Sequence, residues 1–134
     1  MRKLRSILAV LIASALLLAG CGDANYTEAT EPGDAVRYYF DAIADADHDR
    51  ALGFMQFGSP HWAETRDCVN RVIKFRDGLR VKVDSVTRWD ADEFRIDGKL
   101  FTVLGDFVLS WMVRENPSGI WKIVPVNPGG CAGG

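Results

Sequence analysis

The sequence lacks the short motifs that mark the common enzyme and cofactor sites. It contains no HExxH zinc motif, no nucleophile elbow and no phosphate-binding glycine loop. Histidine is also scarce, with only His48 and His61 in the chain. His48 stands between Asp47 and Asp49, a group that could hold a cation loosely but is typical of a solvated turn. We therefore predict no metal site and no cofactor.

The chain also lacks an apolar run long enough to cross a membrane. Its apolar N-terminal run, residues 7–19, has 13 residues and is broken only by Ser14, whereas a spanning helix needs about 20. The run follows Arg2, Lys3 and Arg5, and small residues close it. A basic start, a short apolar middle and a small-residue end are typical of an export signal.

The end of this run, Leu18-Ala19-Gly20-Cys21, resembles a bacterial lipobox. The resemblance implies that residues 1–20 are a lipoprotein signal peptide and that the Cys21 thiol carries a diacylglyceryl group. A thiolate is a strong nucleophile and suits this transfer, and two acyl chains anchor a protein stably. We expect a lipid anchor in a cell membrane, with the protein on the extracytoplasmic side. The alternative is an ordinary secretory signal in which Cys21 is incidental.

Basic residues are fewer than acidic residues after the predicted signal peptide. From residue 21 the chain has 13 Lys and Arg against 18 Asp and Glu, a net charge of −5. Residues 22–49 contain one basic residue, Arg37. An acidic, exported protein is a poor nucleic-acid binder, and the acidic tether is repelled by anionic headgroups. We therefore expect no nucleic-acid partner and attachment of the tether to the membrane through lipid alone.

Two cysteines remain once Cys21 is lipidated. Export places Cys68 and Cys131 in a compartment that permits disulfides. A bridge between them would close a loop of 62 intervening residues, which stabilises the fold by about 4 kcal/mol in the chain-entropy model. We predict this bridge. The alternative is a buried helix thiol at Cys68 and a loose thiol in the glycine-rich tail.

Helical periodicity appears before any strand pattern. Residues 21–31 read as the lipidated cysteine and a short tether, and residues 32–134 as one domain with a Gly-rich tail. Pro32 opens a helix with an apolar stripe through Tyr39. Asp47 is a predicted N-cap for a second, short helix. Ser59-Pro60 opens a third, which we expect to reach about Arg76.

After Gly78 the apolar period changes from 3.6 to 2. The alternation predicts strands over residues 79–89, 94–97, 99–114 and 120–126, with a hairpin turn at Asp97-Gly98. Helices followed by antiparallel strands indicate an α+β fold. We expect the N-terminal helices to pack on a curved antiparallel sheet of about four strands.

The stretches "AVRYYFDAIADADHDRAL" and "GIWKIVPV" and the order of elements resemble the nuclear transport factor 2-like superfamily. This resemblance implies a cone-shaped, cystatin-like roll over residues 32–126. It also implies an apolar pocket between helices and sheet, and often a dimer formed through the sheet. More narrowly, the chain is similar to small actinobacterial lipoproteins that carry such a domain, many of them without an assigned function.

The predicted strand 99–114 bears on catalysis. Its odd positions, from Phe101 to Val113, are all apolar and are expected to face the helices, so no general base points inward. A bulge at Gly105 would reverse this and turn Asp106 inward. Asp106 is therefore one candidate for a catalytic base, and its alternative is an exposed strand position. His61, which could line a pocket mouth with Trp62, is the other candidate, and its alternative is a surface histidine.

We expect six aromatic residues either to line a ligand pocket or simply to fill the core: Tyr39, Phe40, Trp62, Phe107, Trp111 and Trp121. The function predicted first is a membrane-anchored, non-enzymatic domain that binds a small apolar ligand or an envelope partner protein. The alternatives are an isomerase or dehydratase of the same fold and a purely structural adaptor. Leu104, Val108 and Met112, on the outer face, leave room for a homodimer or another partner.

Overall fold

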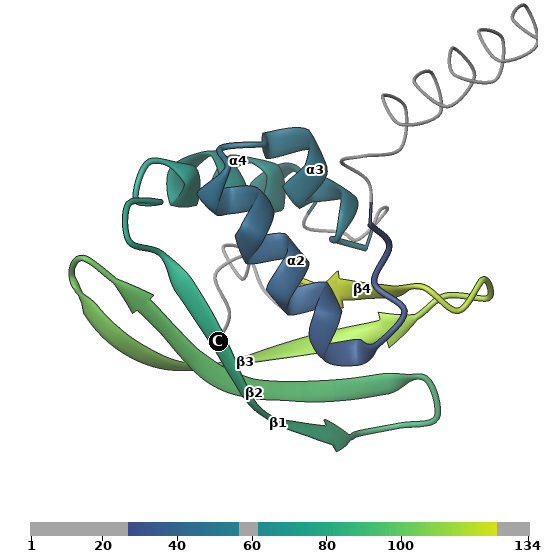
Figure 1. Ribbon diagram of the computed structural model, residues 1–134. Helices are drawn as coiled ribbons and strands as arrows, with labels where there is room; N and C mark the ends of the chain where they lie inside the picture. Colours follow the sequence, from purple (N-terminus) through teal and green to yellow (C-terminus); the bar gives the residue numbers. More distant parts are fainter. Residues whose placement is uncertain (1–26, 57–61, 126–134) are drawn as a thin grey trace, which may run out of the picture.

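The computed structural model describes residues 27–56 and 62–125. Three helices precede four strands in this part of the chain (Figure 1). The elements are α2 (Pro32–Ala44), α3 (His48–Gly53), α4 (Trp62–Ile73), β1 (Arg80–Arg88), β2 (Glu93–Thr102), β3 (Gly105–Glu115) and β4 (Trp121–Val124). The predicted α+β fold with helices before strands is confirmed.

The helices begin where the sequence places its start signals. Pro32 occupies the first turn of α2, where a missing N–H costs nothing. The Asp47 side chain caps α3 by accepting a hydrogen bond from the Arg50 N–H at 3.1 Å. α4 ends at Ile73, earlier than the predicted Arg76, and its predicted opening at Ser59-Pro60 lies outside the described residues.

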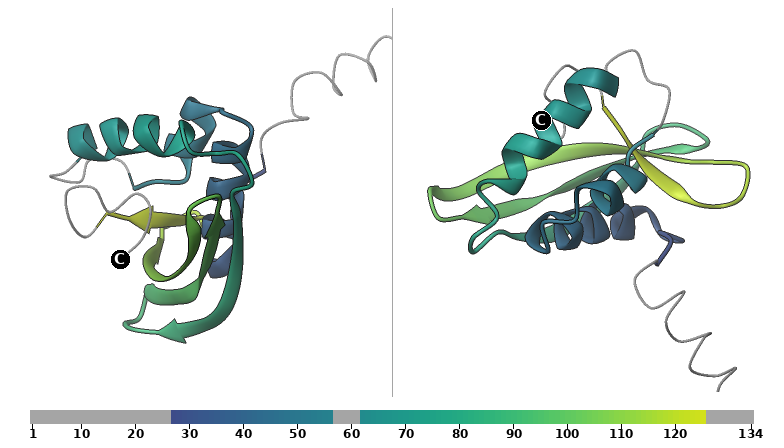
Figure 2. Two further views of the ribbon diagram at one scale, coloured as in Figure 1. Left: turned by 90° about the vertical axis from the view of Figure 1, so that its left-hand side faces the viewer. Right: turned by 90° about the horizontal axis from the view of Figure 1, so that it is seen from above.

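The four strands form one antiparallel sheet in sequence order, β1-β2-β3-β4. The sheet curves, and α2 lies across its inner face in contact with all four strands (Figures 1 and 2). α3 and α4 pack against α2 at one side of the sheet. Tyr39, Ile43, Ile96, Val113 and Ile123 are fully buried between helix and sheet.

The predicted hairpin at Asp97-Gly98 is wrong, and so is a single strand over residues 99–114. β2 runs straight through Gly98, and the chain turns at Val103-Leu104 instead. Gly98 faces the bulge in β1 between Val83 and Ser85, where a Cβ would lie 2.3 Å from the Lys82 carbonyl oxygen. Glycine is needed here for close approach of two strands and not for a turn.

Moving the turn also changes which side chains point inward. Leu100 pairs with Phe107 and is buried, whereas Phe101 pairs with Asp106 on the outer face. A two-residue loop pairs even positions of β2 with odd positions of β3. The predicted inward set therefore holds along β3 and is reversed over residues 99–102, the end of β2. Trp111 and Val113 are buried as predicted.

Candidate functional site

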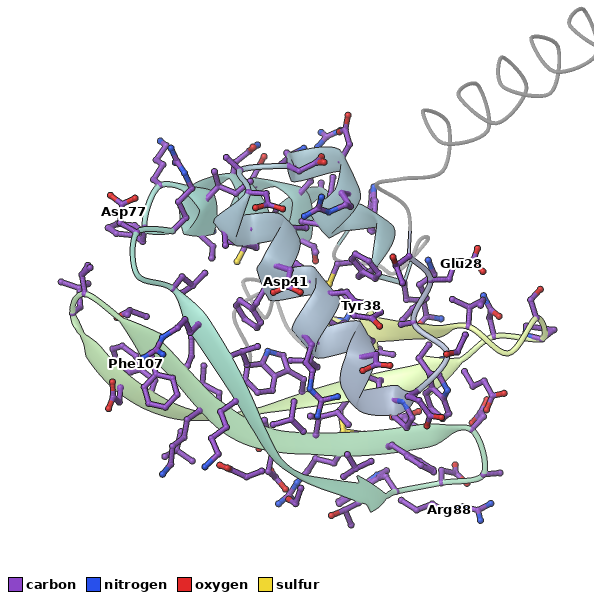
Figure 3. The ribbon with its side chains drawn as sticks, in the orientation of Figure 1. Glu28, Tyr38, Asp41, Asp77, Arg88 and Phe107 are labelled. Carbon is purple, nitrogen blue, oxygen red and sulfur yellow. The ribbon has the colours of Figure 1, made fainter. Side chains whose placement is uncertain are left out.

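An apolar pocket lies between the β2–β3 hairpin and the segment that joins α4 to β1. It has a volume of about 260 Å³, and we call it the hairpin pocket. Its lining residues are Phe75, Leu100, Thr102, Val103, Leu104, Phe107 and Leu109. Figure 3 shows Phe107 at this end of the sheet with Asp77 nearby, and Glu28 and Arg88 at the opposite end. All seven lining residues are uncharged, so the pocket suits an apolar occupant.

The turn at Val103-Leu104 builds one wall of the pocket. The Thr102 hydroxyl accepts a hydrogen bond from the Leu104 N–H at 3.1 Å and donates to the Gly105 carbonyl at 3.0 Å. Gly105 has φ +134°, a backbone conformation that favours glycine. The hydroxyl of Thr102 is therefore engaged in the turn, and the two apolar side chains at the tip are held out from the strands.

Most of the hairpin pocket's apolar rim is open to solvent. Val103 is 67%, Leu104 76% and Phe107 46% exposed, and Phe75 across the pocket is 57% exposed. Exposed apolar surface that gathers in one place marks binding sites more often than scattered residues do. Leu100 and Leu109 form the floor on the inner face of the sheet, where Leu100 is buried and Leu109 half-buried.

The predicted pocket aromatics lie mainly in the core. Tyr39 and Phe40 are packed edge to face with ring centroids 4.9 Å apart, and Phe40 contacts Trp111 in the same way at 5.6 Å. Trp121 is buried against Phe94. These ring contacts fill the space between α2 and the sheet.

The other two predicted aromatics line surface hollows. Phe107 is the member of the set that lines the hairpin pocket. Trp62 lines a separate groove of about 480 Å³ together with Leu52 and Lys122.

The remaining predicted site residues are not brought together. Asp106 is exposed on the outer face, so it does not point toward α2. Cys68 is buried on α4. Cys21, His61 and Cys131 lie outside the described residues, so the lipid attachment, the second candidate base and the disulfide stay predictions.

Ionisable groups with shifted pKa values lie away from the hairpin pocket. Burial raises the pKa of Tyr39 well above its ordinary value. A hydrogen bond from Ser110, at 2.6 Å, is the main cause that lowers the pKa of Asp97, and Arg95 adds to it. Burial lowers the pKa of Lys122, whose ammonium donates to the Gly53 carbonyl, and the charge of Glu28 opposes that shift. Neither these three titratable groups nor the residues that shift their pKa values are among the seven lining residues of the pocket.

Among the described residues, three buried side-chain atoms have no hydrogen-bond partner: the Tyr39 hydroxyl oxygen, the Thr65 hydroxyl oxygen and the Trp111 indole nitrogen. Each such group costs about 1–3 kcal/mol relative to a satisfied one. Within residues 27–56 and 62–125, no group of three or more His, Cys, Asp or Glu side chains is arranged to hold a metal ion. No helix in this same part of the chain is long and apolar enough to cross a membrane.

The fold is that of nuclear transport factor 2-like (NTF2-like) proteins. It is similar to an NTF2-like protein of unknown function from Shewanella oneidensis MR-1, with a TM-score of 0.54 and 11% sequence identity, over 67% of this chain and 88% of that one. It is also similar to a de novo designed protein with a curved β-sheet, with a TM-score of 0.52 and 19% identity over 69% and 93% of the two chains. No protein-family model and no curated protein matches the sequence.

Most residues of the hairpin pocket could not be recognised from the sequence. The predicted strand over residues 99–114 placed Val103 and Leu104 inside a continuous strand, where neither would form a tip. One sequence signal for this turn was Gly105, because glycine commonly occupies turn positions that need a positive φ. In the structure Gly105 has such a φ and directly follows the turn at Val103-Leu104. Phe75 could not be paired with this turn from sequence, because the contact joins segments far apart in the chain.

Proposed function

We propose that this protein is a membrane-anchored envelope lipoprotein that binds a small apolar ligand in the hairpin pocket. The observation that carries the proposal is the pocket itself, with an apolar lining of about 260 Å³ that opens to solvent. Water in such a space has few hydrogen-bond partners, so an apolar group gains free energy by displacing it.

The size and lining of the pocket restrict the ligand. A volume of 260 Å³ corresponds to about nine water molecules of liquid, so we expect one ring or a short acyl segment to fill it. The Thr102 hydroxyl is occupied by the turn, and the lining side chains offer no charge to a polar ligand. Affinity then depends on apolar contact and shape.

Non-catalytic binding is favoured over isomerase-type chemistry by the same residues. A general base must lie within hydrogen-bond reach of the reacting group. The described residues that line the pocket include no Asp, Glu or His, and Asp106 is exposed on the other face of the sheet. The lipid anchor at Cys21 and the Cys68–Cys131 bridge belong to the proposal on sequence grounds, and intact mass and thiol counts before and after reduction test both.

Native mass spectrometry of the chain from residue 22, made without its lipid and recovered from a bacterial periplasm, tests ligand binding. We expect an additional mass that is lost on denaturation. Leu109→Trp places an indole in the pocket and should remove that mass. Met112→Trp is the matched control, because Met112 lies on the same strand but pairs with Arg95 on the outer face. A bare wild-type mass, or an equal loss in both variants, contradicts the proposal.

A further inference from the structure

The β2–β3 hairpin carries more exposed apolar surface than the binding pocket requires. Val108, outside the pocket lining, is 78% exposed. It lies on the outer face of the sheet, whereas Phe107 lies on the inner face with Leu100. Together with Val103, Leu104 and Phe107, Val108 forms an apolar tip, which projects beyond the helices at one end of the molecule (Figures 1 and 2). We call these four residues the hairpin tip.

Basic side chains lie directly behind the hairpin tip on the outer face. Lys82 pairs with Lys99, and Lys99 in turn pairs with Val108. Arg80 pairs with Phe101, and its guanidinium lies 5.4 Å from the centre of that ring. This grouping stands out in a chain that is acidic from residue 21 onward.

Three acidic residues beside this group offset only part of its positive charge, because one of them, Asp97, is already paired with Arg95 at 3.0 Å. Asp84 lies 3.6 Å from the Lys82 ammonium, and Asp106 pairs with Phe101. Lys82 remains 66% exposed at its side chain. Like charges directly opposite each other on neighbouring strands destabilise a sheet, so the pair of Lys82 and Lys99 is costly in the free protein. An anionic partner would relieve this repulsion.

We infer that the hairpin tip and the three cations behind it dock on an anionic lipid bilayer. Apolar side chains bordered by Lys and Arg are the arrangement that enters the headgroup region, with apolar groups inserted and cations at the phosphate level. A two-residue turn is too narrow for a standard protein interface, which takes about 20–30 residues from each partner. The bilayer is therefore the occupant that fits both the shape and the charge.

Docking by the hairpin tip sets the orientation of the domain. Glu28, near the N-terminal end of the described chain, lies at the opposite end from Phe107 (Figure 3). A domain anchored through the predicted lipid and also touching the membrane at the tip would lie with the strands of its sheet along the surface. Three residues of the hairpin tip, Val103, Leu104 and Phe107, also line the hairpin pocket, whereas Val108 and the three cations lie outside it. The contact therefore shares surface with the pocket but does not require a bound ligand.

Vesicle flotation with the unlipidated chain from residue 22 tests the contact. We expect the protein to float with vesicles of phosphatidylglycerol and phosphatidylcholine at low salt, and to stay unbound with phosphatidylcholine alone. Raising the salt from 0.1 M to 1 M shortens the Debye length from about 10 Å to about 3 Å and should release it. Equal binding to both vesicle types, or none to either, overturns the inference.

Variants assign the binding to the hairpin tip. Lys82→Gln with Lys99→Gln should weaken partitioning roughly 30-fold, at about 1 kcal/mol for each cation. Leu104→Ser should reduce it at least about 10-fold, since a buried leucine contributes about 1.5–3 kcal/mol. Trp89→Ser is the matched control, because Trp89 is 66% exposed at the turn between β1 and β2, away from the hairpin tip. This variant should bind vesicles as the wild type does.

Two outcomes would replace the bilayer by another occupant. If Leu104→Ser leaves flotation unchanged, the tip is not the contact. If it converts a dimer to a monomer in sedimentation without changing flotation, the tip binds a second copy of the chain. Leu109→Trp, which occupies the pocket floor, should leave flotation intact, so failure of ligand binding and failure of membrane docking are distinguishable.

Discussion

Replacing Tyr39 by phenylalanine removes one hydroxyl from the centre of the protein. Tyr39 lies on α2 with 0% of its surface exposed, and its hydroxyl has no hydrogen-bond partner in the part of the chain that the structure describes. Its ring is packed edge to face on Phe40, and phenylalanine keeps that contact. In most proteins a buried tyrosine hydroxyl is bonded, and Tyr→Phe is destabilising. Here we expect the opposite sign.

The magnitude follows from the cost of burying an unpaired polar group. An unsatisfied buried donor costs about 1–3 kcal/mol, and a small part of this is returned by the contacts that the oxygen makes. Tyr39→Phe should therefore raise the free energy of unfolding by about 1 kcal/mol at neutral pH. Tyr38→Phe is the control, because Tyr38 is the neighbouring, half-buried tyrosine of the same helix.

The pH dependence gives a second, independent check. Burial raises the pKa of Tyr39 in the folded state, while the unfolded chain titrates near 10. Above pH 10 the unfolded state loses the proton first, so the folded state binds more protons and stability falls as pH rises. The loss is about 1.4 kcal/mol per pH unit up to the folded pKa. The stability advantage of Tyr39→Phe should grow by about 1 kcal/mol between pH 10 and 11, because the unfolded tyrosine is only half ionised at pH 10 and the full slope applies above it.

Urea unfolding followed by tryptophan fluorescence at pH 7, 10 and 11 measures both effects. A Tyr39→Phe variant that is less stable than wild type by 1 kcal/mol or more would show that the hydroxyl has a partner in solution. If the difference in free energy of unfolding between Tyr39→Phe and the wild type does not increase above pH 10, the Tyr39 hydroxyl is not buried without a partner.

Two further predictions concern the sheet. Gly98→Ala should lower the free energy of unfolding by about 2–3 kcal/mol in urea, because the new Cβ would lie 2.3 Å from the Lys82 carbonyl oxygen. Gly53→Ala is its control, as a Cβ there meets nothing within 4 Å, and equal effects would disprove the β1 bulge. Ser110→Ala removes the main hydrogen bond that lowers the pKa of Asp97, so a carboxyl NMR titration should show that pKa rising. The lowered pKa of Asp97 stabilises the folded state above the pKa of the unfolded chain, and this stabilisation is lost as the pH falls. The free energy of unfolding of Ser110→Ala should therefore fall less on acidification than that of the wild type.

The helices could be predicted from sequence because their signals are local. The apolar stripe of α2, the proline in its first turn and the Asp47 cap of α3 each lie within a few residues of the structure that they specify. The alternation in β1 is equally local, and it places Val81 and Val83 against the core as expected. The fold class followed from these local patterns and from their order along the chain.

The turn between β2 and β3 could not be predicted in this way. Asp97-Gly98 is the stronger local turn signal, but the approach of β1 at its bulge requires a glycine in mid-strand at that position. The chain therefore continues to Val103-Leu104, two residues with weak turn preference. That contact between separate strands outweighs the local signal, and it also reverses the inward positions predicted for residues 99–102.

The sequence by itself determined the helices, the order of elements, the acidic charge from residue 21 onward and the expectation of a lipid anchor, since each depends on neighbouring residues or on composition. Only the tertiary structure decided where the hairpin turns and which apolar residues remain exposed. Phe75, Leu100 and Phe107 form one pocket because the curved sheet brings the hairpin against the α4–β1 connection. No periodicity along the chain predicts the contact between the hairpin and Phe75, because it arises from packing between segments far apart in sequence.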